Sequence, residues 1–222
     1  MTARLLTAAA IAFAITAPPA AAAGTVAPLK DCYVAAGDSA AEREKVSLVG
    51  EDFTPEAVLD VLVDGILADT VQVDTVGAFR GTVDTPPQPE GESPFTVVVR
   101  DPREPAEAIT LTSRLTALDV TLRPRRANSS RRVRLRGRGF TRAAPIWAHY
   151  LYEGEEQKTV RLTRRPKGRC GRFSVRRRQI PIANPGSGEW DIQIDQRRGY
   201  SPVLRPVWVR VPVTVTRSFV EP

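Results

Sequence analysis

The sequence has few of the residues that enzymes and metalloproteins use. Its 222 residues include one His and two Cys, too few for a polyhistidine zinc centre or a four-thiolate cluster built from these ligands alone. No Gly-x-Ser-x-Gly turn is present, and no Ser has the sequence context of a nucleophile. No amphipathic helix of credible length appears. We therefore expect a protein that is not an enzyme and needs no metal or cofactor.

The sequence is also short of long apolar runs. The main one, residues 5–17, follows Arg4 and leads into an alanine-rich stretch at 20–23, which is the organisation of a secretory signal peptide. A membrane anchor is the alternative, but a spanning helix needs roughly 20 apolar residues. We expect residues 1–23 to be removed before Gly24. The mature chain would be secreted or attached to the cell surface, without a transmembrane segment.

Short runs of alternating apolar residues recur after this segment, separated by Gly, Pro and Asp clusters. Alternation with period two is typical of antiparallel strands, and Gly and Pro favour the turns between them. The clearest runs are 46–48, 58–63, 95–99, 109–111, 133–135, 146–151 and 207–215. The pattern predicts an all-β protein.

The chain also contains an internal repeat. Residues 46–54, VSLVGEDFT, return as residues 133–141, VRLRGRGFT. Further on, the GxF at 77–79 matches that at 171–173, and FTVVV at 95–99 matches WDIQI at 190–194. Elements that recur in the same order indicate two copies of one unit. We expect two tandem β-sandwiches, residues 24–116 and 117–222, joined with almost no flexible linker.

These motifs resemble bacterial immunoglobulin-like domains of exported proteins, whose second strand commonly ends in Gly-x-Gly-Phe-Thr. The second copy, with GRGFT at 137–141, AHY at 148–150, CG at 170–171 and GEW at 188–190, looks like a module of secreted actinobacterial proteins. The resemblance implies an immunoglobulin-like fold and export, but no activity. The first copy departs from the pattern at Asp52, where the second Gly would stand.

Charge divides at the same boundary. Residues 24–116 contain 7 Lys plus Arg and 17 Asp plus Glu, a net charge of −10, whereas residues 117–222 contain 24 and 8, a net charge of +16. The net charge of the whole chain, +7, therefore hides a strong separation of charge along it.

Arginine accounts for most of the basic charge of the second half. Alternation along a strand would place four arginines on one face, and guanidinium groups bind phosphate or carboxylate with two hydrogen bonds. The candidate residues are Arg132, Arg134, Arg136 and Arg138, with Arg176, Arg177 and Arg178. The partner would be an anionic cell-surface or wall polymer, or another exported protein. No motif of a dedicated nucleic-acid reader is present. The alternative is a solvated face, or one that docks on the acidic first half.

Aromatic residues could add a sugar platform beside the arginines. The candidates are Trp147, Tyr150 and Tyr152. The repeat register places Trp147 on the outer face of a sheet, but a buried Trp is a normal part of a sandwich core, and a core position is our expectation.

Two catalytic or metal-binding arrangements remain as alternatives. His149 is the only side chain for imidazole chemistry, so a secreted hydrolase would need it in a cleft beside a Ser or a carboxylate. The acidic residues at 60, 64, 69 and 74 could offer oxygen ligands to calcium, but they lack an EF-hand pattern. The DxxG at 74–77 is better explained as a turn.

The two cysteines, Cys32 and Cys170, fall in different halves. Export favours oxidation, so they could form one disulfide that ties the domains together, or they could remain two free thiols. The sequence thus predicts an exported, non-catalytic binding or structural protein. A purely structural spacer or a protein-partner module is the main alternative, and a secreted hydrolase is the lesser one.

Overall fold

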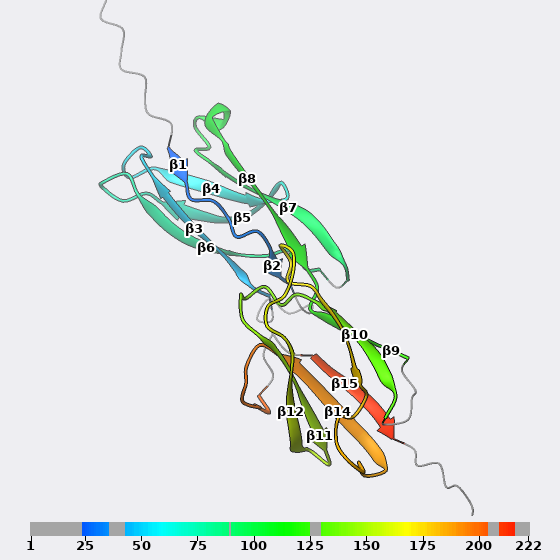
Figure 1. Cartoon of the computed structure of the whole chain (residues 1–222). Helices are drawn as coiled ribbons and strands as arrows, with labels where there is room; N and C mark the ends of the chain where they lie inside the picture. Colours follow the sequence, from blue (N-terminus) through cyan, green and yellow to red (C-terminus); the bar gives the residue numbers. More distant parts are fainter. Residues whose placement is uncertain (1–23, 36–42, 89, 125–129, 204–208, 216–222) are drawn as a thin grey trace, which may run out of the picture.

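A computed structural model describes residues 24–35, 43–88, 90–124, 130–203 and 209–215 (Figure 1). The side chains of 209–211 are not described. The predicted signal peptide lies outside the described residues, as do Val207 and Trp208. Among the residues described, no helix has the length and apolar character needed to cross a membrane.

The first domain is a sandwich of two sheets. One has the order β1-β3-β6, and the other has the order β2-β8-β7-β4-β5. All pairs are antiparallel except β2 with β8. The strands are β1 (Thr25–Val26), β2 (Tyr33–Val34), β3 (Lys45–Glu51), β4 (Val58–Val63), β5 (Ile66–Gln72), β6 (Phe79–Asp84), β7 (Glu92–Arg100) and β8 (Ile109–Thr116). A short 3-10 helix, Pro105–Glu107, precedes β8.

The second domain repeats this plan with the sheets β13-β10-β9 and β12-β11-β14-β15. Its strands are β9 (Asp119–Arg123), β10 (Arg132–Arg138), β11 (Ile146–Tyr152), β12 (Glu155–Thr163), β13 (Phe173–Arg178), β14 (Gly188–Asp195) and β15 (Val209–Val215). The two sandwiches lie end to end (Figure 1). The predicted all-β fold of tandem immunoglobulin-like sandwiches is confirmed.

Each domain has its own core, formed by the inward residues of both sheets. Val46 and Leu48 point into the first core, and their repeat partners Val133 and Leu135 point into the second. The repeat seen in the sequence is therefore a repeat of core positions, because strand alternation fixes which residues face inward.

The recurring glycine and phenylalanine residues form the same contact in both domains. Phe53 packs edge-on against Phe79, and Phe140 packs in the same way against Phe173, each pair with ring centroids 5.3 Å apart. A Cβ at Gly50 would lie 2.1 Å from the Phe79 ring. One at the equivalent glycine of the second domain would lie 2.3 Å from the Phe173 ring. The glycine is required because the ring occupies the place of a side chain.

The loops after β3 and β10 close with matching hydrogen bonds. The Phe53 N–H donates to the Gly77 carbonyl at 3.0 Å, and the Phe140 N–H donates to the Gly171 carbonyl at 3.2 Å. Asp52 has a φ of 65°, where the second copy has Gly139 at 85°. Asp visits this left-handed region more readily than most residues, so the departure in the first copy keeps the backbone shape.

Replacement of the glycine that lies under the phenylalanine ring should destabilise only the domain that contains it. We expect G137A to lower the free energy of unfolding of the second domain by about 1–3 kcal/mol, because the new methyl group must displace Phe173. Urea unfolding followed by tryptophan fluorescence measures this, since all three Trp belong to the second half. G199A is the control, because nothing lies within 4 Å of a Cβ there. Equal stability of the two variants would contradict the packing argument.

Covalent and polar links join the domains. Only Ala117 and Leu118 separate β8 from β9, and the Ala117 N–H donates to the Gly91 carbonyl at 3.1 Å. Cys32 and Cys170 form a disulfide, which decides between the two alternatives left open by the sequence. Both cysteines are buried.

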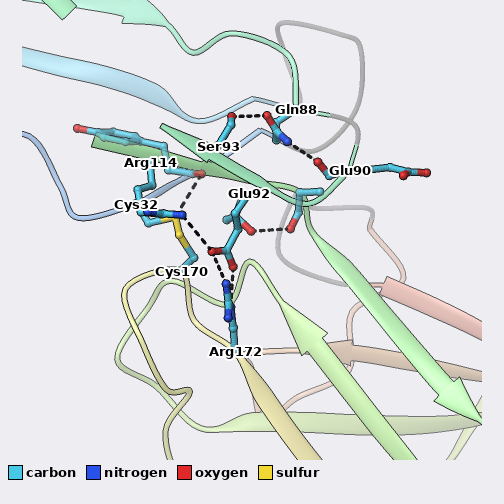
Figure 2. Close-up of polar contacts among 11 residues, drawn as sticks. Cys32, Gln88, Glu90, Glu92, Ser93, Arg114, Cys170 and Arg172 are labelled. Atoms are coloured by element: carbon cyan, nitrogen blue, oxygen red, sulfur yellow. Dashed lines mark hydrogen bonds and ion pairs between the residues drawn. A yellow bond between two sulfur atoms is a disulfide. The ribbon is translucent and has the colours of Figure 1, made fainter. Parts of the chain in front are cut away.

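An ion pair crosses the junction beside the disulfide (Figure 2). The Arg172 guanidinium donates from Nε to Glu92 Oε1 at 2.7 Å and from Nη2 to Glu92 Oε2 at 2.5 Å. Arg114 approaches the same carboxylate at 4.0 Å. The hydrogen bonds from Arg172 outweigh the effect of burial and lower the pKa of Glu92. The chain connection, the disulfide and this pair act at one place, so they fix how the domains meet.

Removal of the disulfide should loosen the junction and lower stability without unfolding either sandwich. The bridge spans 138 residues, and closure of a loop of that size is worth about 2–5 kcal/mol. We expect C32S/C170S to unfold at a lower temperature in calorimetry, with β-sheet circular dichroism unchanged at 25 °C. Reduction of the native protein should give the same shift. A variant with native stability would show that the bridge contributes nothing.

Candidate anion-binding face

Strand β10 carries arginines that point away from the core of the second domain. Val133 and Leu135 are buried, whereas Arg132 and Arg136 are exposed and Arg134 is partly exposed. Because side chains alternate along a strand, these arginines lie on the outer face of the sheet β13-β10-β9. The structure thus places the predicted row on one face, with Arg138 at its end nearest the first domain.

Neighbouring strands add arginines directly beside this row. Arg134 is the register partner of Arg123 on β9 and of Arg176 on β13. Directly opposed residues in an antiparallel pair share a face, with Cβ atoms about 5 Å apart. Arg178 is likewise opposite Arg132. We call Arg123, Arg132, Arg134, Arg136, Arg176 and Arg178 the arginine ladder.

No carboxylate lies within ion-pair distance of the ladder among the residues that the structure describes. Like charges directly opposite each other destabilise a sheet. The ladder therefore costs stability in the protein alone, and a bound anion would remove that cost.

The first domain shows that the fold does not require these arginines. Lys45 and Asp84 are opposite each other on β3 and β6 and form an ion pair at 3.6 Å. The equivalent positions of the second domain are the like-charged pair Arg132 and Arg178. The inward residues of β3 and β10 match, whereas their outward residues differ. The arginines are thus a property of the surface, not of the sandwich.

Two adjacent grooves lie along this face. One, of about 560 Å³, is lined mainly by ladder residues, including Arg134 and Arg176. The other, of about 570 Å³, lies nearer the first domain and is lined by Arg138, Lys167 and Arg172 among others. Arg136 lines both, so the two grooves are adjacent.

The end of this surface nearest the first domain is partly neutralised. Arg138 pairs with Asp119 at 3.1 Å, and Arg172 is held by Glu92. Positive charge without an acidic partner is therefore concentrated in the ladder.

Arg177 does not share this face, although the sequence grouped it with Arg176 and Arg178. It is the register partner of the buried Val133, so it points to the other side of β13. Burial raises the pKa of Tyr150 to about 12, and the charge of Arg177 on that side lowers this pKa only in part. We correct the expected triplet to two arginines.

The predicted aromatic contacts are largely wrong. Tyr150 is 0 % exposed in the second core, because it continues the inward alternation of β11, and it cannot contact a ligand. Trp147 points to the opposite side of that strand and is partly exposed. Our expectation of a core position is therefore wrong, and Trp147 lies on the outer face of the sheet, as the repeat register indicated. Tyr152 packs on Trp190 at 4.9 Å. β11 belongs to the other sheet, so Trp147 and the ladder form no common platform.

His149 lies on the same outer side of β11 as Trp147, yet it is 0 % exposed. Its Nδ1 is 2.9 Å from Glu156 Oε1 and 2.8 Å from Thr159 Oγ1. Its Nε2 is 3.4 Å from Asp195 Oδ1 and 3.2 Å from the Arg197 carbonyl. Both ring nitrogens thus face acceptors, an arrangement that suits the doubly protonated imidazolium.

The charges of this cluster stabilise one another. Burial opposes a charged ring, but hydrogen bonds to Asp195 and Glu156 outweigh it and raise the pKa of His149. Burial would also raise the pKa of Asp195, but hydrogen bonds from His149 and the Arg197 N–H lower it. The ring is enclosed and both nitrogens are engaged, so the cluster holds residues 195–201 against the sheet. The sequence missed Asp195 and Glu156, since neither stands near His149 in a recognisable motif.

The acidic residues considered for calcium have separate roles. Asp60 pairs with Arg100 at 3.3 Å, and Asp64 accepts the Thr96 N–H at 2.8 Å. Asp74 accepts two N–H groups of its own loop, as the turn interpretation predicts. Within the described ranges, no group of three or more His, Cys, Asp or Glu side chains has an arrangement that could hold a metal ion.

Comparison with known proteins gives distant similarities only. No protein-family model and no curated protein matches the chain. The repeat region of a large adhesion protein matches at 15 % identity over 83 % of this chain and 49 % of that one, with a TM-score of 0.28. The BSP domain of a biofilm-associated protein matches at 12 % identity over 89 % of this chain and 30 % of that one, with a TM-score of 0.25.

The FN1–FN3 domains of chicken CNTN1 match at 9 % identity over 85 % of this chain and 64 % of that one, with a TM-score of 0.26. In each case this chain spans less than two thirds of the matched chain. The fold class described above rests on the strand order and register of the two sandwiches.

The buried cluster predicts a specific pH dependence of stability. The raised pKa of His149 adds stability that is complete below its unfolded value near 6.5 and is lost as the pH rises through the folded value. The lowered pKa values of Asp195 and Glu156 add stability above their unfolded values, lost on acidification. We expect the second domain to lose stability from pH 6 to pH 9, and H149Q to flatten this slope. Urea unfolding followed by tryptophan fluorescence measures both, and parallel slopes would contradict the assignment.

Proposed function

We propose that this protein is an exported, non-catalytic module that binds an anionic polymer of the cell surface or wall through the arginine ladder. Export is supported by the disulfide, since such bonds persist mainly in oxidising compartments outside the cytoplasm. The matched adhesion and biofilm-associated proteins are in keeping with a surface role but carry no part of the argument.

One observation carries the proposal: Arg134 has an arginine opposite it on each of the two neighbouring strands. Arg123 and Arg176 flank it across the sheet. In the first domain, Ser47 and Thr82 stand in the places of Arg134 and Arg176, so the sheet does not need arginine there. Guanidinium groups at this spacing supply several donors to one anion. Binding would replace repulsion between arginines with charge-assisted hydrogen bonds.

A purely structural spacer is the main competing function. It would use the acidic first domain to neutralise the basic second one. Across the junction, the described residues form one ion pair, between Glu92 and Arg172, and the ladder lies on the outer face of its sheet beyond that pair. A hydrolase is disfavoured by the enclosure of His149, which leaves the ring no access to a substrate.

Neutralisation of the ladder should weaken polyanion binding. The test compares residues 24–222 with R132Q/R134Q/R176Q, titrated with heparin, teichoic acid and DNA from low to physiological salt. We expect affinity at low salt to fall about tenfold, since each of the three lost charge contacts contributes up to about 1 kcal/mol.

A matched control removes the same charge elsewhere. R161Q/R164Q/R165Q alters exposed arginines on β12 and the turn after it, which belong to the other sheet. It should retain more affinity than the ladder variant. Equal losses of affinity in the two variants would show that only net charge matters. An absence of binding by the native chain would favour the structural spacer instead.

A further inference from the structure

The shape of the arginine ladder defines the kind of polyanion that it fits. We infer that the ligand is a single extended chain with repeating phosphate or sulfate esters, lying lengthwise along β10 and ending where Asp119 and Glu92 neutralise the surface. This inference rests on the proposed function and names the ligand class of the same site.

The dimensions of the face favour one linear chain. Alternate arginines along β10 recur about every 6.7 Å, so Arg132 and Arg136, the outermost ladder residues on this strand, are about 13 Å apart. The flanking arginines come from β9 and β13, one strand to each side, so the face is about 10 Å wide between the outer strands. A site that is longer than it is wide, and longer than one anion, matches an extended polymer better than a single small anion.

The order of the grooves along β10 sets the path of the chain. The groove around Arg134 adjoins the second groove at Arg136, which lines both. The polymer can therefore follow β10 from Arg132 towards the first domain without leaving the basic surface.

Two carboxylates close this path. Asp119 forms an ion pair with Arg138 at 3.1 Å, and the Glu92 carboxylate accepts two hydrogen bonds from Arg172. Both arginines line the second groove, so each would contact a polymer if its acidic partner were absent. The two acids thus limit the length of chain that the protein grips.

Esters suit the place where three arginines meet. Arg123, Arg134 and Arg176 bring three guanidinium groups to one row across the sheet. A sulfate ester offers three unbridged oxygens and a phosphodiester two, and both stay ionised at neutral pH. Repeated along a chain, such groups can meet successive rows of the ladder.

The test is a series of oligomers of increasing length. Heparin oligosaccharides probe the sulfate ester and oligothymidylates the phosphodiester, each from about two to twelve residues, with residues 24–222 in calorimetry. We expect affinity to climb steeply until the oligomer covers about 13 Å and then to level off. The salt dependence of log K should steepen by about 0.7 per contact for the nucleotide series, up to the same length.

A gain of binding separates this inference from a general charge effect. E92Q frees Arg172, and we expect it to raise the affinity of the longer oligomers about threefold or more and to move the plateau to longer chains. D60N is the matched control, because it frees Arg100 from an ion pair on β4 and β7 with the same change in net charge. The disulfide still joins the domains in E92Q.

The outcomes are distinguishable. Binding that does not depend on length, or equal effects of E92Q and D60N, would overturn the linear path while the proposed function stands. Tighter binding of polygalacturonate than of either ester series would overturn the ester assignment. No binding of any polyanion would remove the proposed function itself. A plateau in one series and not in the other would support the inference and name the source of the ester.

Discussion

Alternation of side chains along β10 is the constraint on which both the core and the arginine ladder of the second domain depend. Val133 and Leu135 must point inward to fill the core, and this fixes Arg132, Arg134 and Arg136 on the opposite side. Register with β9 and β13 then brings further arginines beside them. A slip of one residue would bury arginines and expose the core, so the hydrophobic pattern that stabilises the sandwich also holds the charged face in place.

The comparison within the chain shows which features serve the fold and which serve the surface. Both domains keep a glycine under a phenylalanine ring, the paired rings and the hydrogen bond that closes the following loop. They differ in the outward residues of the same strands, where an ion pair in the first domain becomes a pair of arginines in the second. Folding places no demand for arginine there, so the accumulation of charge points to a role at the surface.

The junction holds the acidic and basic domains together without cancelling their charges. The disulfide and the pairing of Glu92 with Arg172 act at one point between the sandwiches (Figure 2). The ladder lies along the outer face of a sheet, away from that point. The protein therefore keeps a strong separation of charge, which can orient it on an anionic surface.

The sequence by itself determined the strands, the tandem repeat and the row of arginines on β10, because period-two alternation and recurring Gly and Phe are local signals. It did not place Trp147, because a residue on the outer face of a sheet and one in the core differ by a single register step. Nor did it show the contacts of His149 with Asp195 and Glu156, or the bond between Cys32 and Cys170, which lie 138 residues apart. Those contacts depend on how strands and loops far apart in the chain pack together, and only the tertiary structure decides that.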